Sequence, residues 1–382
     1  MIKLATETID NKDIDSLIKW LGTYPRLTKG PLTEEYEAAW SKYLGVENSL
    51  FVNSGSSAVM LMLATLLEAK KINIGDEVIV PALSWATDVS SVVNLGLVPV
   101  LCDCNLIDLS LDIKDLNRII NSPRETPRVI IVVPVLGLVP DMAKLKELCN
   151  KNNIIMLEDC CEALGSEYDG KKLGTFGEMS AFSTYFGHHI STIEGGMVCT
   201  DNYNYSQILK SIRSHGWDRD LDKTTKERYR KYWDVSEFNS LYTFYHSGFN
   251  VRATDLQAFL GIGQLKKLDK INKARNKNFK LYLKHLDMGS LYCRPGCFVS
   301  NFAFPIVNTK RDAIVEALEK NNVEVRPLIC GSMGQQPFFI RRYSETKLEN
   351  ADLLRAFGMY LPNHHLITEA DVKSVCEIVN SV

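Results

Sequence analysis

Two adjacent histidines stand shortly before a glycine pair in the segment YFGHHISTIEGG, which covers residues 185–196. The glycines and small polar residues on either side predict a loop. Imidazole has an unperturbed pKa of about 6.5, so a histidine can accept and return a proton near neutral pH. His188 is therefore a candidate acid–base group, and we expect a structural or solvent-exposed role for His189. Because neighbouring histidines are poorly spaced to bind one zinc ion, we expect no metal.

The run SGSSA is a second candidate, and it stands between an apolar strand pattern and an apolar helix pattern. Gly55, Ser56 and Ser57 there would offer N–H groups and hydroxyls at the start of a helix, an arrangement that suits a phosphate group. The same residues also fit an ordinary helix cap by Ser54 or Ser56. The motif alone leaves both interpretations open.

Trp85 and Asp159 each follow an apolar strand pattern, in PALSWATD and IIMLEDC respectively. An aromatic face at that point could stack on a ligand ring, although a buried core tryptophan fits the pattern equally. An aspartate could pair with a protonated ring nitrogen or cap the following turn. Each signal is weak by itself.

The elements that must position these residues alternate along the first half of the chain. Apolar strand patterns separated by helical patterns predict an α/β protein with a largely parallel sheet buried on both faces. Ligands of such sheets bind beyond the carboxyl ends of the strands. We therefore expect site residues within 53–57, 81–85, 159–162 and 183–196.

The second half departs from this alternation. Residues 220–250 are charged and aromatic without a clean period, which predicts a long loop-like excursion that is functional or partly mobile. A helix in residues 254–286 then leads into a small α+β unit. The expected division is a large domain over 1–252 and a small domain over 253–382.

Bulk properties exclude several function classes. The 382 residues carry a net charge of -2, which gives no basis for binding nucleic acid or an anionic membrane. We see neither a signal peptide nor a long apolar run, so we expect a cytoplasmic protein. The ten cysteines contain no C-x-x-C spacing, and we expect them reduced and partly buried rather than bound to zinc or an iron–sulfur cluster.

The order of these motifs resembles the DegT/DnrJ/EryC1/StrS family of sugar aminotransferases, which use pyridoxal 5'-phosphate (PLP). The resemblance runs from LTKGPLTEEYE to LPNHHLITEADV, and its most specific parts are SGSSA, LEDCCEALGS, FSTYFGHHISTIEGG, IRSHGW and GFNVRATDLQAFLGIGQLKKLD. It implies the type I aspartate aminotransferase fold, with a mainly parallel seven-stranded sheet and a small C-terminal α+β domain.

One position departs from the common family pattern. Where most members have a lysine that binds the cofactor covalently, this chain has His188, which has no primary amine. That difference resembles the smaller branch of sugar 3-dehydratases. Glu162 likewise stands where most members have a glutamine, and a protonated glutamate could donate the same hydrogen bond to the cofactor's phenolic oxygen.

The resemblance also implies roles for the remaining residues. Ser56, Ser57 and Ser183 would hold the cofactor phosphate, and Asn250 would reach it from a second subunit, which implies a homodimer with shared active sites. Trp85 would stack on the ring, and Asp159 would keep its nitrogen protonated.

Three further residues are candidates for the sugar or its diphosphate: His215, Arg219 and Arg326. A guanidinium suits such a group, although structural salt bridges would explain either arginine equally well.

The reaction implied is removal of the C3 hydroxyl from a nucleotide-linked 4-keto-6-deoxyhexose, with GDP-4-keto-6-deoxy-D-mannose as the expected substrate. L-glutamate would convert the cofactor to pyridoxamine 5'-phosphate, and ammonia would be released; His188 would be the catalytic base. The alternatives are a nucleotide-sugar 4-aminotransferase, an iron–sulfur-dependent dehydratase and a catalytically silent binding protein.

Overall fold

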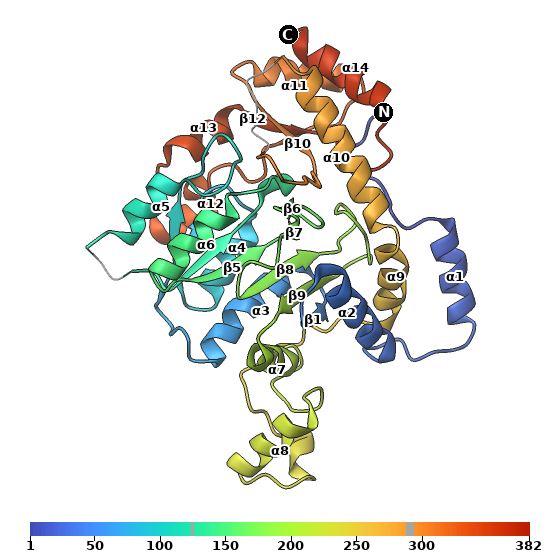
Figure 1. Ribbon diagram of the computed structural model, residues 1–382, viewed down its shortest axis with the longest axis vertical. Helices are drawn as coiled ribbons and strands as arrows, with labels where there is room; N and C mark the ends of the chain where they lie inside the picture. The colour runs from blue at the N-terminus through green and yellow to red at the C-terminus, as the bar shows by residue number, and fades with distance from the viewer. Residues whose placement is uncertain (124–125, 288–293) are drawn as a thin grey trace.

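The computed structural model describes residues 1–123, 126–287 and 294–382, and its centre is a seven-stranded sheet (Figure 1). In spatial order the strands are β1 (Asn48–Val52), β9 (Gly196–Thr200), β8 (Met179–Ser183), β5 (Ile155–Asp159), β4 (Val129–Val132), β2 (Glu77–Pro81) and β3 (Val98–Cys102). All run parallel except β9, which pairs antiparallel with both neighbours. The mainly parallel sheet expected from the sequence is confirmed.

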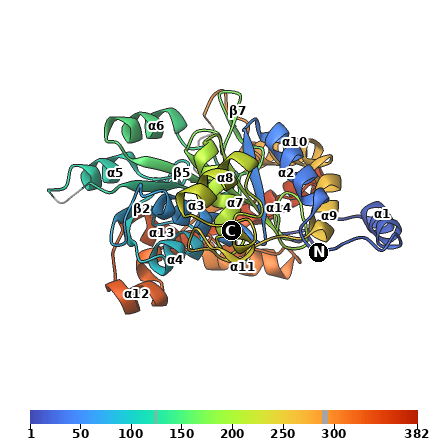
Figure 2. The same cartoon turned by 90° about the horizontal axis from the view of Figure 1, so that it is seen from below.

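Helices cover both faces of this sheet. Figure 2 shows α5 (Ile113–Ile120) and α6 (Met142–Lys151) on one face, with α3 (Gly55–Glu68) and α4 (Ala86–Asn94) on the other. The strands are buried over almost their whole length, as β4 illustrates with four buried aliphatic residues in four positions. Burial on both faces explains why the strand sequences are continuously apolar rather than alternating.

The strand directions bring several chain segments to one edge of the sheet. Asp159 pairs with Ala181 across β5 and β8, while Val52 and Ser183 both stand opposite Gly196, the first residue of the antiparallel strand β9. The carboxyl ends of β1, β5 and β8 therefore meet there. This is the edge at which sheets of this kind bind ligands.

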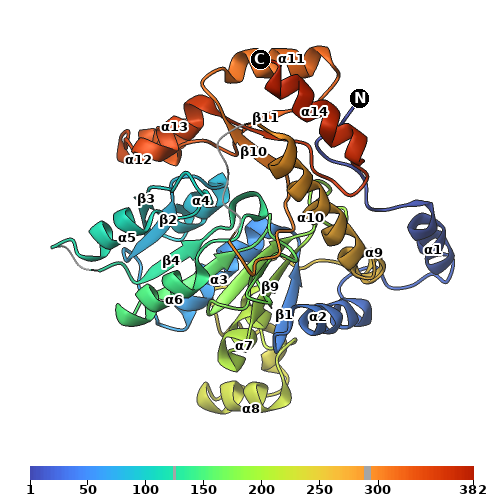
Figure 3. The same cartoon turned by 45° about the horizontal axis from the view of Figure 1, so that its top comes forward.

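A second, three-stranded sheet lies toward the C-terminal end of the chain (Figure 3). Its strands are β10 (Phe304–Val307), β12 (Gly358–Leu361) and β11 (Arg326–Pro327), all antiparallel. Helices α11 (Arg311–Lys320), α12 (Pro337–Tyr343), α13 (Glu349–Phe357) and α14 (Glu369–Asn380) accompany them. The small α+β unit is thus observed, whereas the domain boundary after residue 252 stays a prediction.

The remaining elements connect these two sheets and project from them. They are α1 (Asn11–Leu21), α2 (Pro31–Leu44), the short strands β6 (Glu167–Tyr168) and β7 (Lys171–Lys172), α7 (Tyr203–Ile212), α8 (Lys223–Tyr232), α9 (Asp255–Leu265), α10 (Leu268–His285), and the 3-10 turns Val135–Gly137, Asn239–Tyr242 and Met333–Gln335. The single helix expected over 254–286 is wrong, because α9 and α10 are separated at Lys266 and Lys267.

The excursion of residues 220–250 contains regular structure that the sequence pattern did not indicate. Asp222 caps α8 by accepting a hydrogen bond from the Thr225 N–H, so the segment is not the continuous loop we expected. Figure 1 shows α8 projecting away from the sheet. His246 holds the returning chain to the end of α3 through a 2.8 Å contact between its Nδ1 and Glu68 Oε2. Among the described residues, no helix is long and apolar enough to span a membrane.

Candidate active site

The SGSSA turn stands at the carboxyl end of β1, where it opens helix α3. Ser54 caps the helix because its hydroxyl accepts from the Ser57 N–H at 3.1 Å, which confirms the capping interpretation for this serine. The cap leaves the N–H groups of Gly55 and Ser56 at the open end of the helix. Ser56 Oγ also shares a 2.8 Å hydrogen bond with Thr87 Oγ1. The turn therefore combines a cap with an anion-binding helix start.

Glycine is required at one position of this turn and at the first residue of β9, which packs against it. A Cβ atom on Gly55 would lie 2.8 Å from both Cys161 Sγ and Ser183 Cβ. A Cβ atom on Gly196 would lie 2.3 Å from the Ser54 carbonyl oxygen. These approaches place the turn in direct contact with Ser183 at the end of β8, with Cys161 just after β5, and with the start of β9.

The segment after β5 carries the two acidic candidates. Asp159 is buried, and its Oδ1 accepts from the Cys161 N–H at 2.9 Å. Glu162 Oε2 accepts from the Leu136 N–H at 2.8 Å. Burial, reinforced by the nearby negative charge of Asp159, raises the pKa of Glu162 to about 7. Glu162 is therefore partly protonated at neutral pH.

His188 lies on the loop that joins β8 to β9. The loop is closed by a 2.5 Å hydrogen bond between the hydroxyls of Thr184 and Thr192. The imidazole stands 5.2 Å from the ring of Phe302 and hydrogen-bonds the backbone of Cys161. Its Nδ1 is buried and has no hydrogen-bond partner within the described ranges. The structure therefore offers one unengaged imidazole nitrogen at this edge of the sheet.

The environment of His188 sets its protonation state. Burial lowers its pKa to about 4, and the positive charge of Arg275 acts in the same direction. Arg275 is buried beneath Phe302, where it donates to backbone carbonyls, including that of Phe302 at 2.7 Å. Sequence reasoning missed Arg275 because its position in a helix gave no sign that it would be buried. His188 is thus neutral at pH 7.

His189 faces away from the site. It is fully buried, and its Nε2 lies 2.9 Å from the Ser300 carbonyl oxygen. This residue anchors the loop to the segment before β10, so the structural role expected for it is confirmed and the solvent-exposed alternative is wrong.

Trp85 forms the open side of the same site. It is the N-cap residue of α4 and 59% exposed, which excludes the core role that the sequence had left open. The C-terminal unit approaches it here, because the Met333 N–H donates to the Ala82 carbonyl at 2.8 Å and Cys330 contacts the backbone of Ala86. An exposed indole at a site margin is available to a planar ligand.

The remaining candidates lie around this centre rather than in it. Arg326 is exposed on β11 beside Tyr360, whose pKa is raised to about 12 by burial and by Glu162. Arg219 stacks on Trp217 at 3.8 Å. Neither arginine makes an ion pair within the described ranges, where Arg326 donates to the Val325 carbonyl and Arg219 to that of Leu241; the salt-bridge interpretation is therefore wrong for both.

His215 and Asn250 lie where the chain comes back to the large sheet at the end of the 220–250 excursion. Ser214 bridges to Asn250, and the Asn53 N–H donates to the Val251 carbonyl at 2.9 Å. His215 has a left-handed φ of 65° and stands 5.1 Å from the Trp217 ring. Asn250 is exposed beside β1, so its side chain faces outward from this chain.

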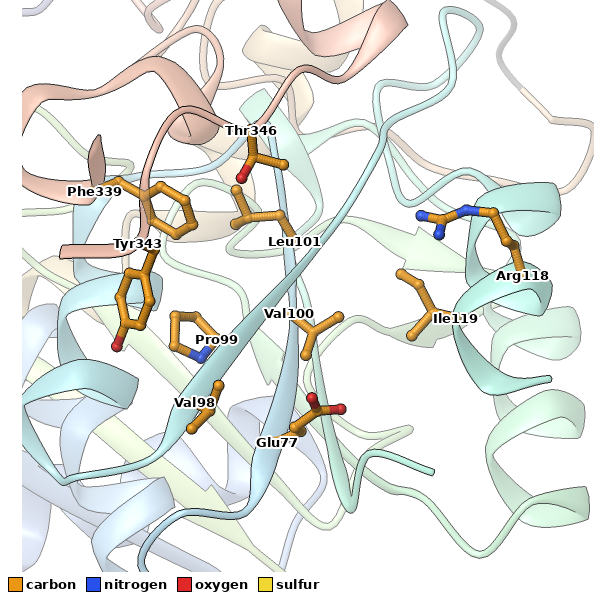
Figure 4. Close-up of a pocket in the computed structure, with 10 residues that line it drawn as sticks. All are labelled: Glu77, Val98, Pro99, Val100, Leu101, Arg118, Ile119, Phe339, Tyr343 and Thr346. Atoms are coloured by element: carbon orange, nitrogen blue, oxygen red, sulfur yellow. The ribbon is translucent and has the colours of Figure 1, made fainter. Parts of the chain in front are cut away.

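One pocket lies apart from this edge of the sheet. A pocket of about 270 Å³ is lined by Glu77 and Val98, the first residues of β2 and β3, together with Arg118 and Tyr343 (Figure 4). Its lining follows the outer strand β3 from Val98 to Leu101, and β3 is at the opposite side of the sheet from β1. No cluster of three or more metal-ligating side chains occurs in residues 1–123, 126–287 or 294–382.

Comparisons with known proteins show the family of this chain. The sequence pattern of the DegT/DnrJ/EryC1/StrS aminotransferase family matches residues 8–380. The chain belongs to this family. One relative is the GDP-4-keto-6-deoxy-D-mannose 3-dehydratase of Escherichia coli O55:H7, which is 32% identical over 95% of each chain. Another is the GDP-perosamine synthase of Caulobacter vibrioides, 28% identical over 100% of this chain and 98% of the relative.

Solved structures of the family share the fold. A GDP-4-keto-6-deoxymannose 3-dehydratase with a trapped PLP–glutamate geminal diamine superimposes with a TM-score of 0.89 at 28% identity, covering 99% of this chain and 100% of the other. The aminotransferase fold expected from the family resemblance is therefore confirmed. The family contains both dehydratases and synthases of amino sugars, so membership alone leaves the reaction open.

Proposed function

We propose that this chain is a PLP-dependent 3-dehydratase of a nucleotide-linked 4-keto-6-deoxyhexose, with GDP-4-keto-6-deoxy-D-mannose as substrate and L-glutamate as amino donor. The observation that carries the proposal is His188, a neutral imidazole with an unengaged buried nitrogen on a loop where most family members have a lysine. The cofactor expected from the sequence is confirmed by the solved relative that binds PLP.

The residues around this edge fit that cofactor. The start of α3 suits a phosphate, with the Ser56 N–H and the Ser57 hydroxyl as donors, and the absence of a side chain at Gly55 lets this helix start lie directly against Ser183. Trp85 offers an exposed ring for stacking, and the buried carboxylate of Asp159 suits a protonated ring nitrogen. When bound, pyridoxal phosphate supplies an electron sink for bonds next to the attached nitrogen.

His188 would then transfer protons, and Glu162 would donate a hydrogen bond to the cofactor. A pKa of about 4 keeps the His188 imidazole neutral, so the ring can accept the proton from the C4′ carbon. Once protonated, an imidazolium with a pKa of about 4 is more acidic than an ordinary one, so it returns the proton readily to the departing C3 hydroxyl. Glu162, with a pKa of about 7, can donate a hydrogen bond to the phenolic oxygen. No lysine amine is needed in these steps.

Histidine in place of lysine also favours elimination over amine transfer. A lysine side chain has a long flexible stem and a primary amine, which can bind the cofactor and deliver a proton to the sugar C4 carbon. The shorter imidazole of His188 is held at the backbone of Cys161 and against Phe302. It can do neither, so the amino group leaves as ammonia.

The same proposal includes a homodimer. Asn250 is exposed, and the excursion around it presents large apolar side chains to solvent: Tyr232, Trp233, Phe238, Leu241, Tyr242 and Phe244, which are 49–81% exposed. A concentration of exposed aromatic residues is typical of a protein interface. A second copy covering this excursion would bring its own Asn250 toward the neighbouring SGSSA turn.

The test combines the purified protein, PLP, L-glutamate and GDP-4-keto-6-deoxymannose, with sugar mass and free ammonia measured together. A product lighter by one oxygen with equimolar ammonia supports the proposal, and omission of glutamate should stop it. A 4-amino sugar without ammonia would replace the proposal with a 4-aminotransferase. The His188→Asn variant is the matched control, since it keeps a polar side chain of similar reach and removes the base.

A further inference from the structure

Asp88 is a buried carboxyl group with no part in the proposed mechanism. It lies in the first turn of α4, three residues after Trp85, and is 0% exposed. The Ser84 hydroxyl is its one hydrogen-bond donor in the described part of the chain, and no ion-pair partner faces it there. An ionised carboxylate is strongly destabilised in such surroundings. The protonated form is the one these surroundings tolerate.

The neighbour of Asp88 is the candidate cofactor ligand. The Asp88 and Asp159 carboxyl groups lie within hydrogen-bonding reach of each other. Glu162 and the thiols of Cys161 and Cys330 are the other titratable groups that act on this pair, and all of them are acids. Two carboxylates are both hydrogen-bond acceptors, so they can bond to each other only if one carries a proton.

The hydrogen bonds around the pair indicate which member is protonated. Asp159 Oδ1 accepts from the Cys161 N–H at 2.9 Å, an interaction that stabilises the charged form. Asp88 has only the Ser84 hydroxyl, whose single proton is also within reach of the Trp85 carbonyl, whereas Asp159 has both the N–H and the thiol of Cys161. Burial and the adjacent charge of Asp159 raise the pKa of Asp88 well above its usual value. The start of α4 favours the anion at Asp88, but a helix end acts weakly compared with a like charge in contact.

We propose that Asp88 and Asp159 form an acid pair that holds one proton, which resides on Asp88 and is donated to Asp159. Asp88 is then a positioning residue. It fixes the rotamer of Asp159 and lets that carboxylate keep its charge while buried, ready for the ring nitrogen. The role in cofactor binding rests on the proposed function, whereas the shared proton is a property of the protein alone.

The first measurement compares urea unfolding of the cofactor-free wild type, Asp88→Asn and Asp88→Ala between about pH 5 and pH 8. A native group with a raised pKa keeps its proton while the unfolded chain loses it, so wild-type stability falls as pH rises. Asparagine is close in shape to the protonated acid and does not ionise. We expect Asp88→Asn to gain stability over the wild type progressively across this range.

The second measurement is the PLP dissociation constant of the same three proteins. Asparagine still donates an N–H to Asp159, whereas alanine does not. We expect Asp88→Asn to retain cofactor affinity and Asp88→Ala to lose about ten-fold, as is usual when a charged group loses one donor. Asp159→Asn should reduce the pH dependence of unfolding, because the charge that holds the proton on Asp88 is removed.

Two results would overturn the acid pair. One is a stability difference between wild type and Asp88→Asn that stays constant with pH, since Asp88 would then hold no extra proton. The other is an equal loss of PLP affinity in Asp88→Asn and Asp88→Ala. That result would mean that Asp88 supports cofactor binding through a negative charge and not through a donated hydrogen bond. Failure of the dehydratase assay alone would leave the unfolding result intact, so the two proposals fail separately.

Discussion

The two sides of the candidate site differ in how the chain holds them. On the inner side, Asp159, Glu162 and His188 are fixed by backbone hydrogen bonds and have pKa values displaced by burial. On the outer side, Trp85 and Asn250 are exposed and stand free of such constraints. The inner side therefore has its chemistry set by the fold, whereas the outer side is available to substrate and to a second subunit.

Removal of the His188 imidazole should have the largest effect of any substitution on the inner side. His188→Asn should lower the dehydration rate by about 10²–10⁴-fold, the usual contribution of a positioned acid–base group. Because the side chain does not hold the cofactor phosphate, PLP affinity should change little. Single-turnover release of ammonia measures the first quantity, and absorbance titration measures the second. An unchanged rate would remove His188 from the mechanism.

Asp159 is expected to have the next largest effect. Asp159→Asn keeps the shape of the side chain but removes the charge that pairs with a protonated ring nitrogen. Loss of a charge-assisted hydrogen bond should weaken PLP binding by about 10–100-fold. Equilibrium dialysis measures this, and Glu158→Gln serves as a buried control, since Glu158 instead accepts from the N–H groups of Gly174, Phe176 and Gly177. Equal affinity in wild type and Asp159→Asn would contradict the assignment.

Glu162 gives a prediction with a defined sign. Its pKa is raised from 4.5 to about 7, so the wild type loses stability as pH rises through that interval, because the unfolded chain ionises first. Glu162→Gln does not ionise, and its side-chain oxygen can still accept from the Leu136 N–H. The variant should match the wild type near pH 4 and exceed it by about 3 kcal/mol near pH 8. Urea unfolding across this range checks it, and parallel curves would contradict it.

Substitutions on the outer side of the site should have smaller effects on cofactor affinity. Trp85→Ala should reduce PLP affinity by about two- to ten-fold, the usual worth of one stacked aromatic ring, and leave the free energy of unfolding nearly unchanged because the indole is 59% exposed. Trp85→Phe should restore most of the affinity. A large loss of stability in Trp85→Ala would instead place the indole in the packing of the fold.

Sequence reasoning succeeded where a pattern reflects the polypeptide backbone. The apolar strands, the SGSSA turn and the strand-end position of Asp159 follow from periodicity and from the directions of parallel strands. The helix α8 was missed because its residues, KTTKERYRKY, have no apolar face. Such a face is the main sign of a helix in a sequence.

The sequence also gives no indication of which polar residues are buried. Asp88 and Arg275 look like solvent-facing members of helices, yet both are buried through contacts with segments far away in the chain. Those contacts are set by tertiary packing, which a single sequence does not display. The protonation states of His188 and Glu162 depend on the same packing, so the sequence could single out these two residues but could not give their pKa values.

The start of the described chain is tied to its C-terminal unit. The Ile2 N–H donates to the Asn322 carbonyl at 2.9 Å, the Glu324 N–H returns a bond to the Ile2 carbonyl, and the Leu4 N–H donates to the Glu324 side chain. During synthesis Ile2 leaves the ribosome long before its partners exist. This segment therefore docks only after residue 324 has emerged, and a nascent chain stalled earlier presents it unpaired to chaperones and proteases.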